Sequence, residues 1–158
     1  MLLVKICKVA CIVTVYNKEK YFHRSLSSLL EQTVFPDLVI FIDDGSTDQS
    51  EQVFLQYESE LRARGKIIYQ LRENSGVADT RNYAASLVPD DYYIANLDAD
   101  DAWRPAFIER VKSVINDNNY PVAIGTAYSV NRCGDIEERG IEQKEGYLNY
   151  NDLDLKNF

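Results

Sequence analysis

Short apolar segments alternate with helical segments along most of this chain. Residues 9–15 and 38–42 are apolar at nearly every position, which is typical of parallel strands that are buried on both faces. Between them, residues 18–32 repeat apolar side chains at the spacing of one helix face. Strands and helices in alternation indicate βαβ units. The pattern therefore predicts an α/β fold built on a mostly parallel sheet.

The same alternation continues to about residue 130. Asp48 and Glu51 have the spacing of a capping box, which predicts that a helix begins at Asp48, and Gly65 is a natural place for it to end. Beyond Arg132 the chain is charged and interrupted by glycines, which fits a hairpin, a lid or a disordered end. Further strands are expected over residues 66–71, 92–97 and 122–130, and further helices over residues 77–86 and from Pro105 onward.

Length and composition narrow the class of protein. The 158 residues suit a single domain, and the 46% hydrophobic and 27% charged residues exclude a disordered or fibrous protein. The chain carries 17 Lys and Arg against 25 Asp and Glu, a net charge of −8. Nucleic acids and anionic membranes favour basic patches, so neither is expected to be the main partner.

The cysteines and the N-terminal segment indicate a cytoplasmic protein. Cys7, Cys11 and Cys133 are an odd number, which fits reduced thiols better than a disulfide scaffold. A single histidine and the lack of a second Cys/His pair argue against a zinc site. No apolar run reaches the roughly 20 residues of a membrane-spanning helix. Two lysines interrupt the apolar N-terminus, so we expect a buried strand there and not a signal peptide.

Polar residues gather at the carboxyl ends of three expected strands. Residues 14–17 follow the first strand, residues 43–48 the second and residues 98–101 the fourth. Ligands of open parallel sheets bind beyond these strand ends, so the three segments are expected to share one rim. Carboxylates brought this close repel one another, and a bound divalent cation would remove that cost. The sequence therefore predicts a site for a metal, or for a ligand that carries one.

Asp98 and Asp100 are the strongest candidates for metal ligands. They lie on the same side of an extended segment, which suits a hard cation that takes oxygen ligands. Mg²⁺ or Mn²⁺ there would bridge to a diphosphate and neutralise charge on a leaving group. Short Asp-rich turns without any ligand are the ordinary alternative. An EF-hand fails, because Trp103 stands where that loop needs Gly and Ala102 offers no ligand.

Other polar residues of the rim also have an ordinary structural interpretation. Gly45 and the residues after it fit a strand-to-helix turn, although such a turn does not explain the adjacent acids Asp43 and Asp44. Arg81 lies in a helix, where most arginines are solvated. Tyr16 would stack on a ring or be a partly buried aromatic at the rim.

An ordered set of short motifs resembles the nucleotide-binding half of a family 2 glycosyltransferase with the GT-A fold. The motifs span about residues 10–134, and their order is more specific than any one of them. This resemblance implies a Rossmann-like three-layer α/β/α sandwich around a mostly parallel sheet. The motifs are Val13-Thr14-Val15-Tyr16-Asn17, Ser27 with Leu29-Leu30-Glu31-Gln32-Thr33, Asp43-Asp44-Gly45-Ser46-Thr47-Asp48, Asn74-Ser75-Gly76-Val77-Ala78, Arg81-Asn82 and Leu97-Asp98-Ala99-Asp100-Asp101.

The resemblance implies a nucleotide-binding role for five residues. Thr14 and Tyr16 would line the base pocket, with Tyr16 against the nucleobase. Asp44 would accept a hydrogen bond from the base, and Arg81 would contact the nucleotide from its helix. Asp98 would bind the ribose.

The resemblance also implies the reaction, which is inverting transfer of a sugar from a nucleoside diphosphate, most readily a UDP-sugar. Asp100 would coordinate the Mn²⁺ or Mg²⁺ that the diphosphate holds. The acceptor would be a saccharide or lipid-linked molecule in cell-surface polysaccharide synthesis, used in the cytoplasm or at the inner face of the membrane. The acceptor proton needs a base, but the acids after Val130 lack the strand and helix context of one. We assign no catalytic base.

The domain organisation follows from the same resemblance. Residues 1–134 would form the nucleotide-sugar-binding domain, and residues 135–158 a partial acceptor-side segment or a flexible tail. We expect the sequence to stop before the acceptor half. One alternative is therefore a module that binds a nucleotide sugar without turnover. A receiver-like signalling domain ranks lower, because it would need an acidic pair where residues 14–17 lie and a lysine after the last strand.

Overall fold

The computed structural model describes residues 7–118, 127–130 and 136–139. The chain divides into two compact units, Met1–Ala123 and Ile124–Phe158. The first unit contains strands β1 (Lys8–Val15), β2 (Leu38–Asp43), β3 (Ile67–Leu71) and β4 (Tyr92–Asp98), and helices α1 (Phe22–Leu30), α2 (Ser50–Arg64), α3 (Val77–Ser86) and α4 (Phe107–Asn118).

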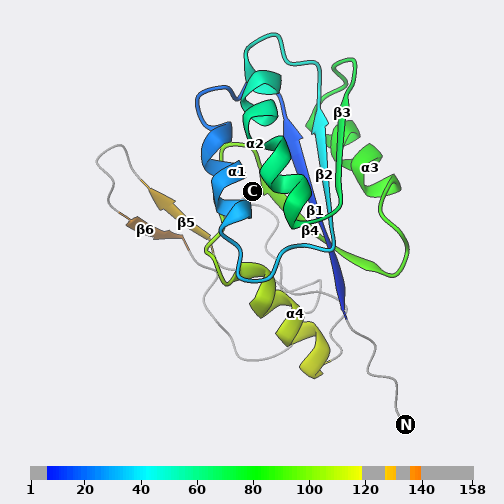
Figure 1. Ribbon diagram of the computed structural model, residues 1–158, viewed down its shortest axis with the longest axis vertical. Coiled ribbons are helices and arrows are strands. Elements are labelled where there is room, and N and C mark those ends of the chain that lie inside the picture. Colours follow the sequence, from blue (N-terminus) through cyan, green and yellow to red (C-terminus); the bar gives the residue numbers. More distant parts are fainter. Residues whose placement is uncertain (1–6, 119–126, 131–135, 140–158) are drawn as a thin grey trace. The chain divides into compact units, whose positions relative to one another are not determined.

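The four strands of the first unit form one parallel sheet (Figure 1). Their order is β3-β2-β1-β4, so β1 lies between β2 and β4. The first four strands of a Rossmann sheet have this order, whereas receiver-like sheets place the second strand outside the first and third. The α/β fold and the parallel sheet are confirmed, and the strand order argues against the receiver-like alternative.

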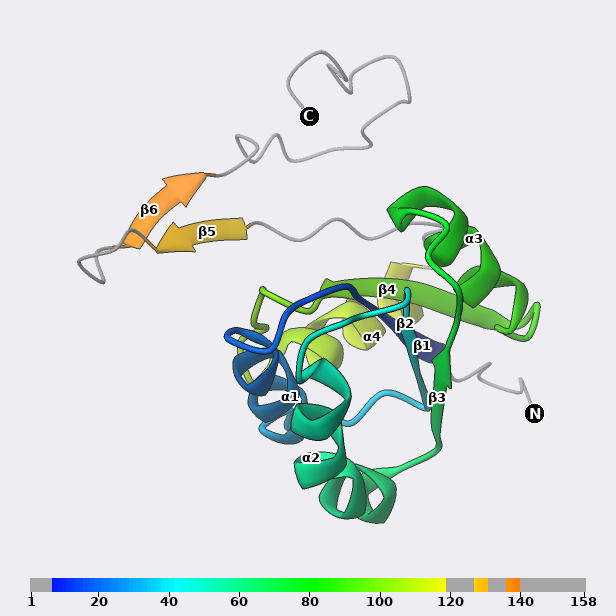
Figure 2. The same cartoon turned by 90° about the horizontal axis from the view of Figure 1, so that it is seen from above.

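Helices cover both faces of this sheet, as a three-layer sandwich requires. Helices α1 and α2 lie on one face and α3 on the other (Figure 2). Alternate side chains of β1 belong to the two cores: Val13 packs with α1 and α2, and Ile12 packs with α3. Both strand residues are at most 2% exposed, so burial on both faces explains the unbroken apolar run in the sequence.

Aromatic side chains form a continuous path through the α1–α2 core. The Phe22 and Phe41 ring centroids are 6.1 Å apart, and those of Phe41 and Phe54 are 5.0 Å apart. The Phe54 and Tyr69 rings stack at 4.2 Å. Each fully buried aromatic of this kind contributes roughly 1.5–3 kcal/mol through burial, so this path ties α1 and α2 to the centre of the sheet.

The ends of two helices differ from the sequence prediction. Helix α1 begins at Phe22 and not at residue 18, because residues 18–21 form a turn in which the Phe22 N–H donates to the Lys18 carbonyl. Helix α2 begins at Ser50, not at Asp48. The Asp48 carboxylate accepts hydrogen bonds from the N–H groups of Ser50 and Glu19, so it joins two loops and is not the N-cap.

Gly65 ends α2 as predicted, but for a different physical reason. Its φ of 179° is extended backbone, which any residue can adopt. A Cβ at this position would lie 2.8 Å from the Phe35 ring, so close approach to that ring is what favours glycine.

The second unit is described only over two short strands. Strand β5 (Ala127–Val130) pairs antiparallel with β6 (Ile136–Arg139), in the manner of a hairpin. The strand expected over residues 122–130 is confirmed for 127–130, and residues 122–126 lie outside the described residues. The two units divide after Ala123, and the expected domain boundary at residue 134 stays a prediction.

Two further expectations concern the cysteines and the membrane. Cys7 and Cys11 are free and buried, and burial raises the pKa of the Cys11 thiol. Cys133 lies outside the described residues. In the part of the chain that is described, every helix is too short or too polar to cross a bilayer.

Candidate functional site

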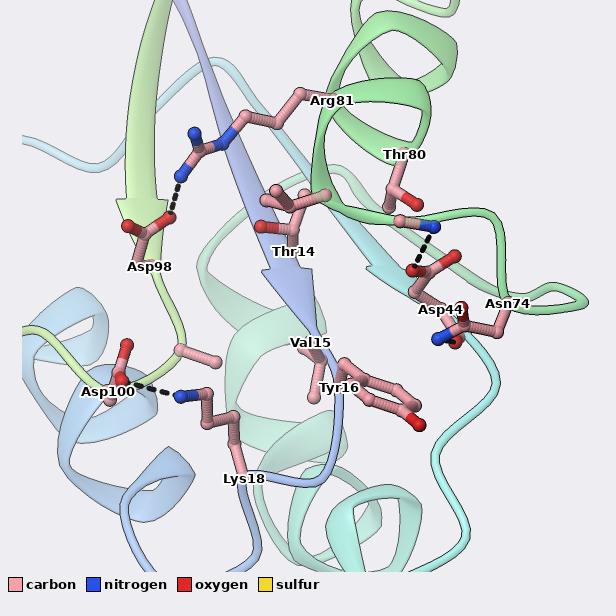
Figure 3. Close-up of a pocket in the computed structure, with 13 residues that line it drawn as sticks. Thr14, Val15, Tyr16, Lys18, Asp44, Asn74, Thr80, Arg81, Asp98 and Asp100 are labelled. Atoms are coloured by element: carbon pink, nitrogen blue, oxygen red, sulfur yellow. Dashed lines mark hydrogen bonds and ion pairs between the residues drawn. The ribbon is translucent and has the colours of Figure 1, made fainter.

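A pocket of about 460 Å³ lies at the carboxyl ends of β1, β2 and β4, beside the start of α3 (Figure 3). The six residues predicted to bind the nucleotide or the metal are spread over residues 14–100, yet all of them line this pocket. They are Thr14, Tyr16, Asp44, Arg81, Asp98 and Asp100. The structure thus brings together the predicted rim, while the role of each residue stays a prediction.

The register of the sheet explains how these residues meet. Thr14 on β1 is the partner of Asp98 on β4, and Val15 is the partner of Asp43 on β2. The chain leaves each strand at this level, and the Asp44 N–H still donates to the Val15 carbonyl at 2.8 Å. Three strands therefore end at one height, as the parallel arrangement requires.

Asp44 is buried and holds the turn that precedes α3. Its Oδ1 accepts hydrogen bonds from the Ser75 N–H at 2.9 Å and the Ser75 hydroxyl at 3.3 Å, and its Oδ2 accepts from the Gly76 N–H at 3.0 Å. Burial alone would raise the pKa of Asp44, but the hydrogen bonds from Ser75, Thr80 and Gly76 outweigh it and lower that pKa. The carboxylate is therefore ionised and anchors α3 against β2.

Asp43, the neighbouring acid, has a separate structural role. It is 1% exposed and accepts hydrogen bonds from the Ser46 N–H at 2.7 Å and the Tyr69 hydroxyl at 3.1 Å. Burial and the nearby Asp43 charge raise the pKa of Tyr69. Asp43 therefore closes the strand-to-helix turn, which accounts for one of the two adjacent acids that a simple turn left unexplained.

Each acid of the Asp98-Ala99-Asp100 segment is paired with a cation. The Arg81 Nη2 lies 2.5 Å from the Asp98 Oδ1, and the Lys18 Nζ lies 2.6 Å from the Asp100 Oδ2 (Figure 3). These side chains are 35% to 43% exposed, so each pair contributes only about 0.2–1 kcal/mol. Lys18 is not among the residues predicted from the sequence, because its spacing along the chain gives no indication of a contact with Asp100.

The charges of this segment affect the pKa of Asp101, which does not itself line the pocket. Burial raises the pKa of Asp101, and the negative charges of Asp100 and Asp98 raise it further, while Arg24 and Lys18 lower it. The three acids are thus electrostatically coupled, as the clustering in the sequence indicated.

The loop after β1 is fixed by hydrogen bonds to the loop after β2. Asn17 has a φ of 52°, and its N–H donates to the Ser46 hydroxyl at 3.0 Å. In return, the Thr47 N–H donates to the Asn17 Oδ1 at 2.8 Å. The Lys18 N–H donates to the Ser50 hydroxyl at 2.8 Å. These bonds turn the chain so that Lys18 extends toward Asp100 (Figure 3).

The aromatic residues Tyr16 and Trp103 have different environments. Tyr16 lines the pocket and is 48% exposed, so its ring is available to a ligand. Trp103 instead stacks on Phe107, with ring centroids 4.5 Å apart, and packs against the core. Of the two, only Tyr16 can contact a ligand in this pocket.

The acidic residues of the pocket fit a metal that arrives with its own ligands. Across residues 7–118 and the two described strands that follow, no group of three or more His, Cys, Asp or Glu side chains could hold a metal ion. Asp98 and Asp100 still present two carboxylates to the pocket. Mg²⁺ is typically bound through one or two carboxylates together with substrate phosphates, so this donor set suits a metal–diphosphate ligand.

Comparison with known proteins agrees with this geometry. The family model described as Glycosyl transferase family 2 matches residues 10–157. A curated relative from Haemophilus influenzae, named as an uncharacterized glycosyltransferase, is 33% identical over 148 residues, which are 92% of this chain and 44% of the relative. The chain spans less than half the length of the curated relatives that it matches first.

Solved structures show the same fold. S. aureus TarS 1-349 in complex with UDP-GlcNAc matches with a TM-score of 0.63 and 28% identity, over 71% of this chain and 32% of that chain. The mannosyltransferase PcManGT from Pyrobaculum calidifontis, in complex with GDP-Man and Mn²⁺, matches with a TM-score of 0.58 and 23% identity, over 79% of this chain and 36% of that chain. The second likeness concerns the fold alone.

Proposed function

The chain belongs to glycosyl transferase family 2, and on that premise we propose that it binds a UDP-sugar and takes part in inverting transfer of the sugar. The acceptor is a saccharide or lipid-linked molecule in cell-surface polysaccharide synthesis. Residues 1–134 supply the donor-binding domain, and residues 135–158 are a partial acceptor-side segment or a flexible tail.

The observation that carries this proposal is the pocket of about 460 Å³ with all six selected residues on its wall. Its volume lies in the range of small-molecule sites, about 300–1,000 Å³. Its position beyond the carboxyl ends of parallel strands is the usual place for a nucleotide in such sheets. The UDP-GlcNAc complex of TarS, a structure that shares this fold, supports a uridine nucleotide as the ligand.

The residues divide the nucleotide between them. Tyr16 is exposed to the pocket and stacks on the base, and Thr14, near the end of β1, lines the same base pocket. Asp44 accepts a hydrogen bond from the base while it anchors α3, so the base and the helix share one carboxylate. Asp98 binds the ribose, and Arg81 beside it contacts the nucleotide from α3.

The reaction requires stabilisation of the leaving diphosphate. Asp100 would hold a divalent metal, Mn²⁺ or Mg²⁺, which neutralises negative charge on a leaving group when it is bound. Arg81, which is paired with Asp98, adds a positive charge to the wall of the pocket. No catalytic base is assigned among the described residues, so deprotonation of the acceptor is left outside this scheme.

Calorimetric titration with UDP, with and without Mn²⁺, tests the proposal. Wild type is expected to bind UDP more tightly when Mn²⁺ is present, and Asp100→Ala is expected to lose that metal effect. GDP and dTDP serve as matched nucleotides. Equal or absent binding of all three, with no effect of Mn²⁺, would contradict the proposal.

Turnover is a separate measurement, made as release of UDP from donor sugars. Metal-dependent UDP binding without release would support the second candidate, a module that binds a nucleotide sugar without turnover.

A further inference from the structure

The ion pair between Lys18 and Asp100 occupies the carboxylate that the proposed function assigns to the metal. The Lys18 Nζ lies 2.6 Å from the Asp100 Oδ2. We infer that Lys18 is a positioning residue that competes with the divalent metal for Asp100 and thereby makes metal binding depend on the nucleotide. This inference rests on the proposed function, since it concerns the same site.

The backbone beneath Lys18 is fixed, while its side chain is free to leave Asp100. The Asn17 N–H donates to the hydroxyl of Ser46 in the loop after β2, and the Lys18 N–H donates to the hydroxyl of Ser50 at the start of α2. The Lys18 side chain is 35% exposed and the Asp100 side chain 42%. A pair with this exposure is held weakly, so the ammonium group can be exchanged for another cation without disturbing the turn that carries it.

Charge balance explains why the competition matters. Asp98 is already paired with Arg81, and a third acid, Asp101, directly follows Asp100. Lys18 therefore reduces repulsion among these acids while no metal is present. A metal at Asp100 competes with the ammonium group, because two cations on one carboxylate repel each other.

A nucleotide changes this balance in favour of the metal. A diphosphate brings oxygen ligands and negative charge to the pocket, which adds to the attraction for the metal. Without the nucleotide, the metal gains mainly the Asp100 carboxylate as a ligand, and it has to compete with Lys18 for that carboxylate. The expected behaviour is weak binding of the metal alone and tight binding of the metal together with UDP.

The test is a titration of the full chain with Mn²⁺, in which free Mn²⁺ is followed by electron paramagnetic resonance, with and without UDP. Lys18→Met removes the competing cation and keeps the aliphatic stem. It is expected to tighten binding of Mn²⁺ alone by about three- to fivefold, the upper part of what an exposed ion pair supports. UDP should then improve Mn²⁺ binding less than it does in wild type.

Two variants make the comparison specific. Lys20→Met removes the same charge from an exposed side chain two residues away and is expected to bind Mn²⁺ as wild type does. Lys18→Arg keeps a cation at the same position and is expected to retain most of the competition. Far-ultraviolet circular dichroism confirms that each variant is folded, and Lys18→Gln replaces Lys18→Met if the latter is not.

The outcomes separate this inference from the proposed function. In one outcome, wild type binds Mn²⁺ with UDP, but Lys18→Met binds Mn²⁺ alone no more tightly than Lys20→Met. Lys18 then does not compete with the metal, which overturns the inference and leaves the proposed function intact. If Lys18→Met weakens Mn²⁺ binding, Lys18 assists the metal, and the inference is likewise overturned. If wild type binds no Mn²⁺ even with UDP, that result contradicts both the inference and the proposed function.

Discussion

Replacing Asp44 with alanine should destabilise the first unit by about 2 kcal/mol. The carboxylate accepts hydrogen bonds from the Ser75 N–H, the Ser75 hydroxyl and the Gly76 N–H. A donor that loses its partner costs about 1–3 kcal/mol when it is buried. Ser75 and Gly76 are exposed, so water replaces part of what is lost and the low end of that range applies to each of the two N–H groups.

The assay for Asp44→Ala is urea unfolding followed by circular dichroism, with thermal unfolding as a second readout. A loss of about 2 kcal/mol corresponds to a fall in Tm of about 4–8 °C for a chain of this size. Asp90→Ala makes the same change at an exposed turn position and is expected to stay within about 0.5 kcal/mol of wild type. An Asp44→Ala variant as stable as Asp90→Ala would refute the anchoring role.

The lowered pKa of Asp44 adds a dependence on pH. Because the folded-state pKa lies below the ordinary value of 3.8, the ionised group stabilises the fold fully at pH values above 3.8. That contribution is lost as the pH falls through the folded-state pKa. Asp44→Asn, which cannot titrate, should therefore lose less stability than wild type between neutral pH and pH about 3. Equal losses in the two proteins would show that Asp44 is not responsible.

Three further predictions concern the pocket and the core. Tyr16→Ala should weaken UDP binding by about 1–3 kcal/mol through loss of stacking, whereas Tyr16→Phe should bind as wild type does in the same calorimetric titration; an unchanged affinity in Tyr16→Ala would exclude stacking. Phe54→Ala should cost about 3–5 kcal/mol in urea unfolding, because Phe54 is 1% exposed between two aromatic rings; a loss below about 1 kcal/mol would contradict that packing. Gly45→Ala should lower Tm, because φ is +77° and a Cβ would lie 3.0 Å from the Asn74 nitrogen; a wild-type Tm would contradict this strain.

The sheet and the composition of the pocket were predictable from the sequence. Residues 9–15 and 38–42 are apolar at nearly every position. A strand that is buried on both faces requires this pattern. A parallel sheet then brings their carboxyl ends to one edge, so Thr14, Asp44 and Asp98 had to lie near one another. Arg81 could be predicted as a site residue only from the resemblance, because an arginine in a helix does not by itself indicate a binding role.

The pairings inside the pocket were not predictable, because they depend on tertiary contacts with no periodic signal. The sequence gives no reason to connect Lys18 with Asp100, which lie 2.6 Å apart only because Asn17 turns the chain. Asp48 has the spacing of a cap but bonds to Glu19 as well as Ser50. A local rule cannot anticipate a partner that a neighbouring loop supplies.

The pairing of β1 with β4 has a consequence for the order of events during synthesis. Strand β1 is made first, yet the register joins Lys8 with Tyr92 on its outer side. Strands β1 and β2 can pair as soon as β2 leaves the ribosome. Strand β1 is then an edge strand, and it becomes a central strand only when β4 has been made and pairs with it. Such long-range pairing is slow, because a large loop must close before the contacts form. The pocket, whose wall includes Asp98 and Asp100, is therefore incomplete until β4 has been made, and a nascent chain released before β4 lacks both carboxylates.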